Sequence, residues 1–143
     1  MDRATFEAVR DIPGKVIRVD IRLAARRQTQ PALVAENIVI ENNSGVALRL
    51  NISYNPEVGS KTFNVTAAGV GPICRLDVDG PAHRPAGRSH KHSLQTDRCP
   101  ERNLPDNVGD RADLAGKTVT DLFAIFCQMA DIAHLGTFFP PIT

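Results

Sequence analysis

Apolar and polar residues alternate along several short segments of the chain. Ile17, Val19, Ile21 and Leu23 alternate with charged residues, and the same alternation runs over residues 46–54. A period of two residues is typical of a strand with one wet face. The pattern predicts five strands, over residues 15–23, 33–41, 46–54, 62–67 and 73–79.

Turn-forming residues separate these segments and predict how the strands pair. Residues 42–45 and 55–59 suit tight turns, because Asn, Pro and Gly favour turn conformations. Short connections of this kind join antiparallel neighbours, whereas parallel strands need long crossovers. The chain is therefore expected to form an antiparallel meander.

Helical spacing of apolar residues appears at the two ends of the chain. Residues 3–12 suit a short helix. A second helix is expected to begin with Thr118 or Thr120 as its cap and to include Ala133, with Gly136 suited to its end. The predicted fold class is α+β: an antiparallel sheet of five or six strands, open or curled toward a barrel, with a C-terminal helix on one face.

Length and composition are those of one globular domain that spans residues 1–143. Hydrophobic residues make up 42% of the chain and aromatic residues only 5%, so we expect an aliphatic core. The net charge of +1 gives no overall field that would attract nucleic acid or an anionic membrane. Any preference for anions must therefore be local.

The chain carries no feature that predicts a membrane or an oxidising compartment. Its N-terminus lacks the apolar stretch of a signal peptide, and no apolar run approaches the roughly 20 residues that span a bilayer. Its three cysteines have no C-x-x-C spacing, which favours reduced thiols. We expect a cytoplasmic protein that does not bind membranes.

Over residues 80–116, Pro and Gly interrupt any long helical or strand-like repeat of apolar residues. One short strand still fits near residues 89–95. Long loops in compact domains are often functional, so a site is expected here. Three of the four histidines, His83, His90 and His92, lie in the first part of this region. In a strand, His90 and His92 would lie on one face with about 7 Å between their Cα atoms.

Two carboxylates precede the histidines. In the predicted strand over residues 73–79, Asp77 and Asp79 alternate with the apolar residues Leu76 and Val78. Alternation is expected to direct both carboxylates away from the core and toward the histidines. Asp77 is therefore grouped with His83, His90 and His92 as a candidate catalytic set.

Three kinds of chemistry fit this set. Two histidines can act as acid and base in phosphodiester cleavage without a cofactor, because imidazole titrates near neutral pH. Phosphate would then contact Arg84, Arg88 and Lys91. Alternatively, zinc or another divalent metal would be held by His83, His90, His92 and Asp79. In the third interpretation the histidines are exposed loop residues with no shared role.

The run R-L-D-V-D-G-P-A-H over residues 75–83, followed by H-K-H at 90–92 and a closing helix, resembles an uncharacterised family of small bacterial proteins. That family has the pattern L-D-x-x-G-P-x-H, an N-P-D-G turn and P-H-x-H. The resemblance covers residues 45–132, although the Asn and Asp of the turn are absent. It implies that Asp77, Gly80, Pro81, His83, His90 and His92 act as a unit, without naming a reaction.

The functional hypothesis is a phosphodiesterase or ribonuclease-like enzyme that acts on RNA or another phosphate-bearing ligand. The choice of RNA is made by analogy with small bacterial proteins of toxin–antitoxin or phage-defence operons. The alternative is a non-catalytic module that binds an anionic partner or a structural metal. A third hypothesis is an interaction protein whose sheet edge, or the apolar tail over residues 138–141, contacts a partner or a second copy in a homodimer.

Overall fold

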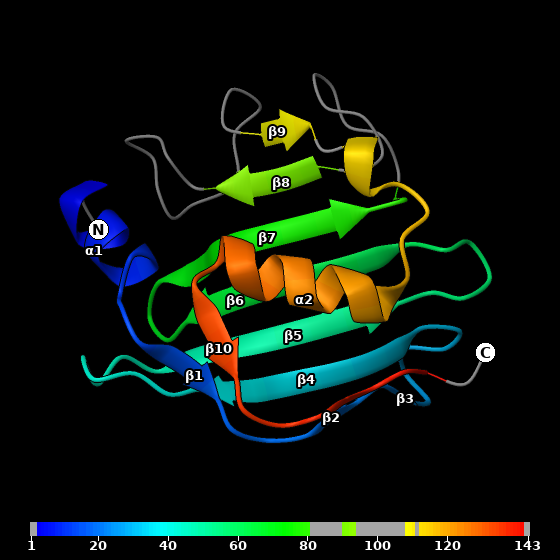
Figure 1. The fold of residues 1–143 in the computed structure, drawn as a ribbon, viewed down its shortest axis with the longest axis horizontal. Helices are drawn as coiled ribbons and strands as arrows, with labels where there is room; N and C mark the ends of the chain where they lie inside the picture. Colours follow the sequence, from blue (N-terminus) through cyan, green and yellow to red (C-terminus); the bar gives the residue numbers. More distant parts are fainter. Residues whose placement is uncertain (1–2, 81–89, 94–107, 111, 142–143) are drawn as a thin grey trace.

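Most of the segments with alternating residues form one antiparallel sheet, and a helix covers one of its faces (Figure 1). The computed structural model describes residues 3–80, 90–93, 108–110 and 112–141, with residues 3, 5–7, 90–93, 108–110 and 112 described by their backbones. None of the helices in these ranges is long and apolar enough to cross a membrane. The elements are α1 (Arg3–Arg10), β1 (Lys15–Ile17), β2 (Ile21–Arg22), β3 (Ala24–Ala25), β4 (Leu33–Ile40), β5 (Leu48–Tyr54), β6 (Lys61–Ala67), β7 (Gly71–Val78), β8 (His90–Ser93), β9 (Val108–Asp110), η2 (Ala112–Leu114), α2 (Val119–Met129), β10 (Ile132–His134) and β11 (Phe138–Phe139).

The sheet follows chain order from β3 to β9, and every neighbouring pair is antiparallel. Its strands β4 to β7 correspond to four of the five predicted strands, whereas β3 lies outside the predicted strand over residues 15–23. β8 corresponds to the short strand expected near residues 89–95, and β9 extends the sheet further within the predicted long loop. The sheet is open, with β3 and β9 at its edges. The predicted α+β class with a C-terminal helix is thus confirmed.

A single asparagine organises the turn between β4 and β5. The Asn42 Oδ1 atom accepts hydrogen bonds from the backbone N–H groups of Ser44 and Val46, at 3.0 and 3.3 Å. Gly45 follows with a φ of 70°, in the left-handed region that glycine tolerates best. These contacts close the turn in the way that the sequence predicted.

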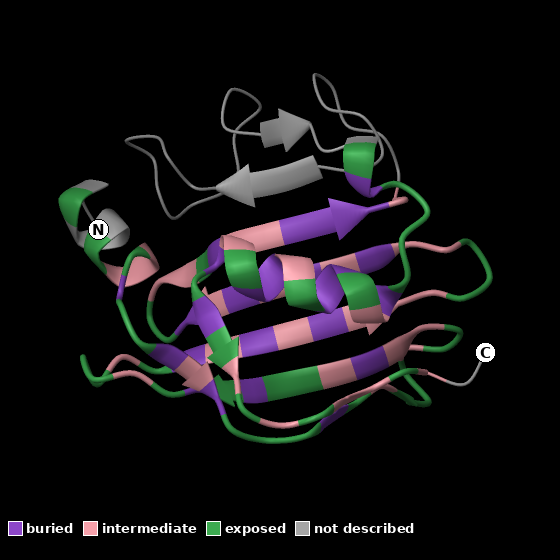
Figure 2. Ribbon diagram, viewed as in Figure 1, coloured by how far each residue is buried: buried purple, intermediate pink, exposed green. Residues whose placement is uncertain are grey.

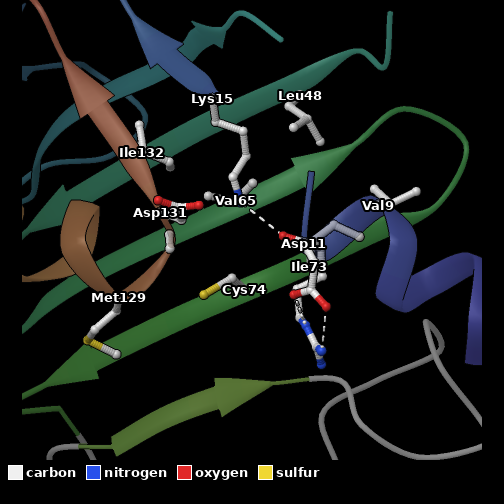
Figure 3. Close-up of a pocket in the computed structure, with 12 residues that line it drawn as sticks. Val9, Asp11, Lys15, Leu48, Val65, Ile73, Cys74, Met129, Asp131 and Ile132 are labelled. Atoms are coloured by element: carbon white, nitrogen blue, oxygen red, sulfur yellow. Dashed lines mark hydrogen bonds and ion pairs between the residues drawn. The ribbon is translucent and has the colours of Figure 1, made fainter. Parts of the chain in front are cut away.

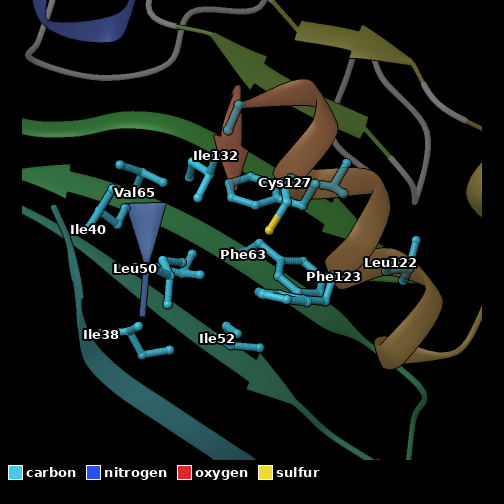
Figure 4. Packing of buried hydrophobic residues seen from close by; sticks show 14 of the residues in the cluster. Ile38, Ile40, Leu50, Ile52, Phe63, Val65, Leu122, Phe123, Cys127 and Ile132 are labelled. Carbon is cyan, nitrogen blue, oxygen red and sulfur yellow. The ribbon is translucent and has the colours of Figure 1, made fainter. Parts of the chain in front are cut away.

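The hydrophobic core lies between α2 and the sheet (Figure 4). Burial alternates along β5 and β6, so one sheet face is apolar and the other is polar (Figure 2). The Phe63 ring of β6 stacks on the Phe126 ring of α2 with a centroid separation of 5.4 Å, and both side chains are fully buried. Aliphatic residues make up most of the remaining core, as the composition predicted.

The second helix begins as predicted but ends early. Thr118 is its N-cap, and the Thr118 Oγ1 atom accepts a hydrogen bond from the Asp121 N–H group at 3.1 Å. The helix ends at Met129, and Asp131 has a φ of 54° that turns the chain away. The expectation that Ala133 belongs to the helix is wrong, because Ala133 lies in β10.

The predicted strand over residues 15–23 is wrong as a single strand. Its two ends, β1 and β2, pair in parallel with β10 and β11 near the C-terminus. Val19, between them, is 50% exposed. A Cβ atom at Gly136 would lie only 2.5 Å from the Val19 carbonyl oxygen, so this glycine permits a close backbone approach rather than ending a helix.

The apolar C-terminal tail packs on its own chain. The Phe138 ring stacks on Phe123 of α2 with 4.5 Å between the ring centroids. The Arg22 guanidinium lies over the Phe139 ring at 3.5 Å from its centroid. Both rings therefore contribute to holding β11 beside β2.

Truncation of the central aromatic pair should destabilise the protein strongly. Replacing a buried aromatic ring by a methyl group removes apolar burial and leaves a cavity, so Phe126→Ala should lower the free energy of unfolding by about 3–5 kcal/mol. The control Val58→Ala, at a position that is 63% exposed, should change it by less than about 0.5 kcal/mol. Urea denaturation of both variants measures these changes, and equal effects would contradict the packing described.

Candidate functional site

The pairing of β7 with β8 brings part of the predicted site together. In the strand register, His90 lies opposite Asp77 and His92 lies opposite Arg75. Lys91 lies between them, opposite Leu76. The backbone of β8 thus adds two of the predicted histidines to the strand that carries the first predicted carboxylate. His83, Arg84 and Arg88 lie outside the described residues.

Asp77 is the best-defined side chain of the predicted set. It is only 7% exposed, although its side chain points to the sheet face that lies away from the core, opposite to the face of Leu76. Its Oδ1 atom accepts a hydrogen bond from the Thr62 hydroxyl at 2.9 Å, and the Arg75 Nε–H group donates to both carboxylate oxygens at 3.1 and 3.0 Å. The carboxylate is therefore held in place by a neighbouring strand and by a charged partner on its own strand.

Asp79 does not share a face with Asp77, which corrects the predicted arrangement. Its φ of 56° interrupts the alternation at the end of β7. The Asp79 carboxylate accepts hydrogen bonds from the Lys61 ammonium at 2.8 Å and from the Gly116 N–H group at 2.9 Å, just before α2. Because Lys61 lies on the core side of β6, Asp79 links the sheet to the segment that leads into the helix.

The part of the chain that the structure describes contains no cluster of side chains that would support the metal hypothesis. No three His, Cys, Asp or Glu side chains converge there as metal ligands would. Among the ligands proposed from the sequence, Asp79 is the one whose side chain is described, and it forms an ion pair with Lys61. A metal at Asp79 would have to compete with this ammonium group.

A cavity of about 340 Å³ lies elsewhere in the fold, on the core side of the sheet (Figure 3). It lies where α1, β1, β7 and β10 meet, and sequence reasoning did not predict it. The Lys15 side chain lines it and is 6% exposed. The Lys15 Nζ atom donates a hydrogen bond to the Arg10 carbonyl oxygen at the end of α1, at 2.9 Å. Cys74 and Asp131 also line the cavity.

The environment of Lys15 disfavours its charged form. Burial lowers the pKa of Lys15 below its usual 10.5, and Cys74, Asp131 and Asp11 oppose this effect without cancelling it. One signal in the sequence points to this position: Lys15 is in phase with Ile17 and Ile21, so alternation assigns it to the apolar face.

Comparisons of this chain with known proteins return no relative. No protein-family model, no curated protein and no solved structure matches it. The proposals that follow are therefore supported by the residues and contacts of the chain itself.

The Lys61–Asp79 ion pair should be important for stability. Removing one charge from a buried pair leaves the other uncompensated, so Asp79→Asn should lower the free energy of unfolding by about 3 kcal/mol. Asparagine keeps an oxygen for the Gly116 N–H group and tolerates positive φ. The double variant Lys61→Met/Asp79→Asn should recover most of the loss in urea denaturation. A double variant no more stable than the single one would contradict a buried unpaired charge as the cause.

The lowered pKa of Lys15 should make stability depend on pH. Between that lowered value and 10.5, the unfolded chain binds more protons than the folded chain. Stability of the parent protein should therefore rise with pH through this window, relative to the Lys15→Met variant. Urea denaturation of both proteins from neutral pH to pH 10.5 measures the difference. The Cys127 thiol, whose pKa burial raises to about 12, affects both proteins alike.

Proposed function

We propose that the protein is a phosphodiesterase that cleaves RNA without a metal, with His90 and His92 as its acid and base. The observation that carries this proposal is the register of β7 and β8, which pairs the two histidines with Asp77 and Arg75. An acid–base pair of imidazoles beside a carboxylate and a guanidinium can catalyse phosphodiester cleavage without a metal.

In the proposed reaction, one imidazole removes the proton from a ribose 2′-hydroxyl, and the 2′-oxygen attacks the phosphorus atom. The bond from phosphorus to the 5′-oxygen breaks, and the second imidazole, in its protonated form, gives its proton to the leaving oxygen. The products are a 2′,3′-cyclic phosphate and a 5′-hydroxyl. Asp77 would stabilise the imidazolium form of His90, since a nearby carboxylate favours the charged imidazole.

Arg75 supports the phosphate-binding part of the proposal. Its Nε–H group is used by Asp77, but its side chain is still 41% exposed. The terminal NH₂ groups of the guanidinium make no hydrogen bond to another described residue and can donate to phosphate oxygens. Arg84, Arg88 and Lys91 would add positive charge around the same phosphate group.

The sheet face that α2 does not cover gives the substrate polar groups to bind. It lies opposite α2 and carries half-buried polar side chains on its central strands β5, β6 and β7, namely Arg49, Asn51, Ser53, Thr62, Asn64, Thr66 and Arg75. The Asn64 Oδ1 atom is buried and has no hydrogen-bond partner among the described residues. It can accept a hydrogen bond from an RNA base or a 2′-hydroxyl.

The alternative function is a module that binds an anionic partner through this face without cleaving it. The exposed guanidinium of Arg75 favours such binding as well. An RNA ligand agrees with the cytoplasmic location expected from the sequence. The RNA-cleavage experiment below distinguishes this alternative from the enzyme, because a module that only binds RNA would leave it intact.

The decisive experiment incubates the pure chain with RNA in the presence of EDTA and analyses the products by gel and mass spectrometry. We expect 2′,3′-cyclic phosphate ends and no cleavage of DNA of the same sequence, because DNA lacks the attacking hydroxyl. His90→Ala and His92→Ala should each lower the cleavage rate by about 100-fold or more. Asp77→Asn should lower it less, because it removes only the group that supports His90.

His134→Ala is the matched control, because this histidine lies in β10 with its Nε2 atom 2.8 Å from the Val19 carbonyl oxygen, away from β8. Its cleavage rate should equal that of the parent protein. A folded parent protein that binds RNA without cleaving it would favour the alternative. Cleavage that survives in His92→Ala would overturn the assignment of the acid–base pair.

A further inference from the structure

The cavity beside Lys15 is a separate structural feature from the polar face of the sheet. Figure 3 shows Lys15 reaching between Asp131 of the α2–β10 turn and Asp11 of the α1–β1 connection. Cys74 of β7 also lines the cavity. Since Arg75 and Asp77 lie on the other sheet face, an inference about this cavity does not depend on the proposed ribonuclease activity.

Lys15 is buried without a full set of partners. A lysine ammonium has three N–H donors, and one of them is used by the Arg10 carbonyl oxygen. No other hydrogen bond joins Lys15 to a described residue, so the remaining donors are available to a molecule in the cavity. A lysine that is more than nine-tenths buried normally has an ion pair or several hydrogen bonds.

The lining residues and the volume of the cavity indicate the size and polarity of the ligand that it can hold. Most lining residues are apolar, namely Val9, Leu48, Val65, Ile73, Met129, Ala130 and Ile132. The volume of about 340 Å³ is at the lower end of the range for small-molecule sites. A small apolar molecule with one polar group directed at Lys15 fits these conditions.

The charges around Lys15 define the polar group. Arg10, Asp11 and Asp131 line the cavity together with Lys15, and Asp11 forms an ion pair with Arg10, so two carboxylates already balance two cations. A carboxylate or phosphate on the ligand would add an unbalanced negative charge to this set. A neutral carbonyl oxygen can instead accept a hydrogen bond from Lys15 without adding this charge.

We propose that this cavity binds a small apolar aldehyde or ketone and that Lys15 captures its carbonyl carbon as an imine. The amine nitrogen adds to the carbonyl carbon, two protons pass from nitrogen to the former carbonyl oxygen, and that oxygen leaves as water while the C=N bond forms. The step is reversible and needs no oxidant or reductant. Asp131 is placed on the cavity wall where it can carry the protons.

The state of the amine supports this chemistry. Imine formation requires an uncharged nitrogen, and burial lowers the pKa of Lys15, which raises the uncharged fraction near neutral pH. Lysines in apolar pockets are activated as nucleophiles in this way. Lys61, which is also buried, forms an ion pair with Asp79 at 2.8 Å and is the natural comparison.

Reductive trapping of the full-length chain tests the proposal. The probe is benzaldehyde at neutral pH with sodium cyanoborohydride, which reduces an imine to a stable amine but does not fix an adduct on the Cys74 thiol. Peptide mapping by mass spectrometry then compares three lysines in one sample: Lys15 in the cavity, Lys61 in its ion pair and the exposed Lys117. We expect several-fold more labelling at Lys15 than at either of the other two.

Variants then assign the labelling to the amine. Lys15→Arg keeps a positive charge but cannot form an imine, so labelling in the cavity should be lost, whereas Lys117→Arg should leave it unchanged. Circular dichroism confirms that each protein is folded. Labelling of Lys15 that does not exceed that of Lys117 in the folded parent protein would overturn the proposal, and this comparison requires no variant.

Discussion

The packing of α2 on one face of the sheet is the interaction on which the rest of the structure depends. The stacked rings of Phe63 and Phe126 join the helix to the sheet, and aliphatic residues make up most of the remaining core. Because α2 covers this face, the opposite face of β5, β6 and β7 carries the polar side chains. The helix does not cover one end of the core. This end is covered by α1, β1 and β10, and the cavity lies there.

Three buried charged residues show how the fold satisfies polar groups, and where it leaves them incompletely satisfied. Lys61 has Asp79, and Asp77 has Arg75 and Thr62, so each of these charges has a direct side-chain partner. Lys15 instead donates to a backbone carbonyl oxygen at the end of α1. A buried charge costs free energy unless it is paired. Of these three residues, Lys15 therefore gains the least stabilisation from its partners to offset the cost of its burial.

Strand β7 connects the two proposed sites. Its alternation directs Arg75 and Asp77 to the open face, beside the register positions of His92 and His90, and Cys74 to the cavity. A bulge between β6 and β7 at Ile73 places both Ile73 and Cys74 against the cavity. One strand thus carries a polar set on one face and an apolar pocket wall on the other, separated by the thickness of the sheet.

The sequence by itself determined the strands over residues 46–54, 62–67 and 73–79, the cap of α2 at Thr118, and a short strand that carries H-x-H, because period and capping chemistry are local properties. Only the tertiary structure decided that β1 and β2 pair with β10 and β11, since alternation reports which face a residue takes but not which strand lies beside it. It also decided the roles of two charged residues. Asp79 leaves its expected face because of a positive φ, and Lys15 enters a cavity lined by N-terminal, central and C-terminal elements that are distant in the chain.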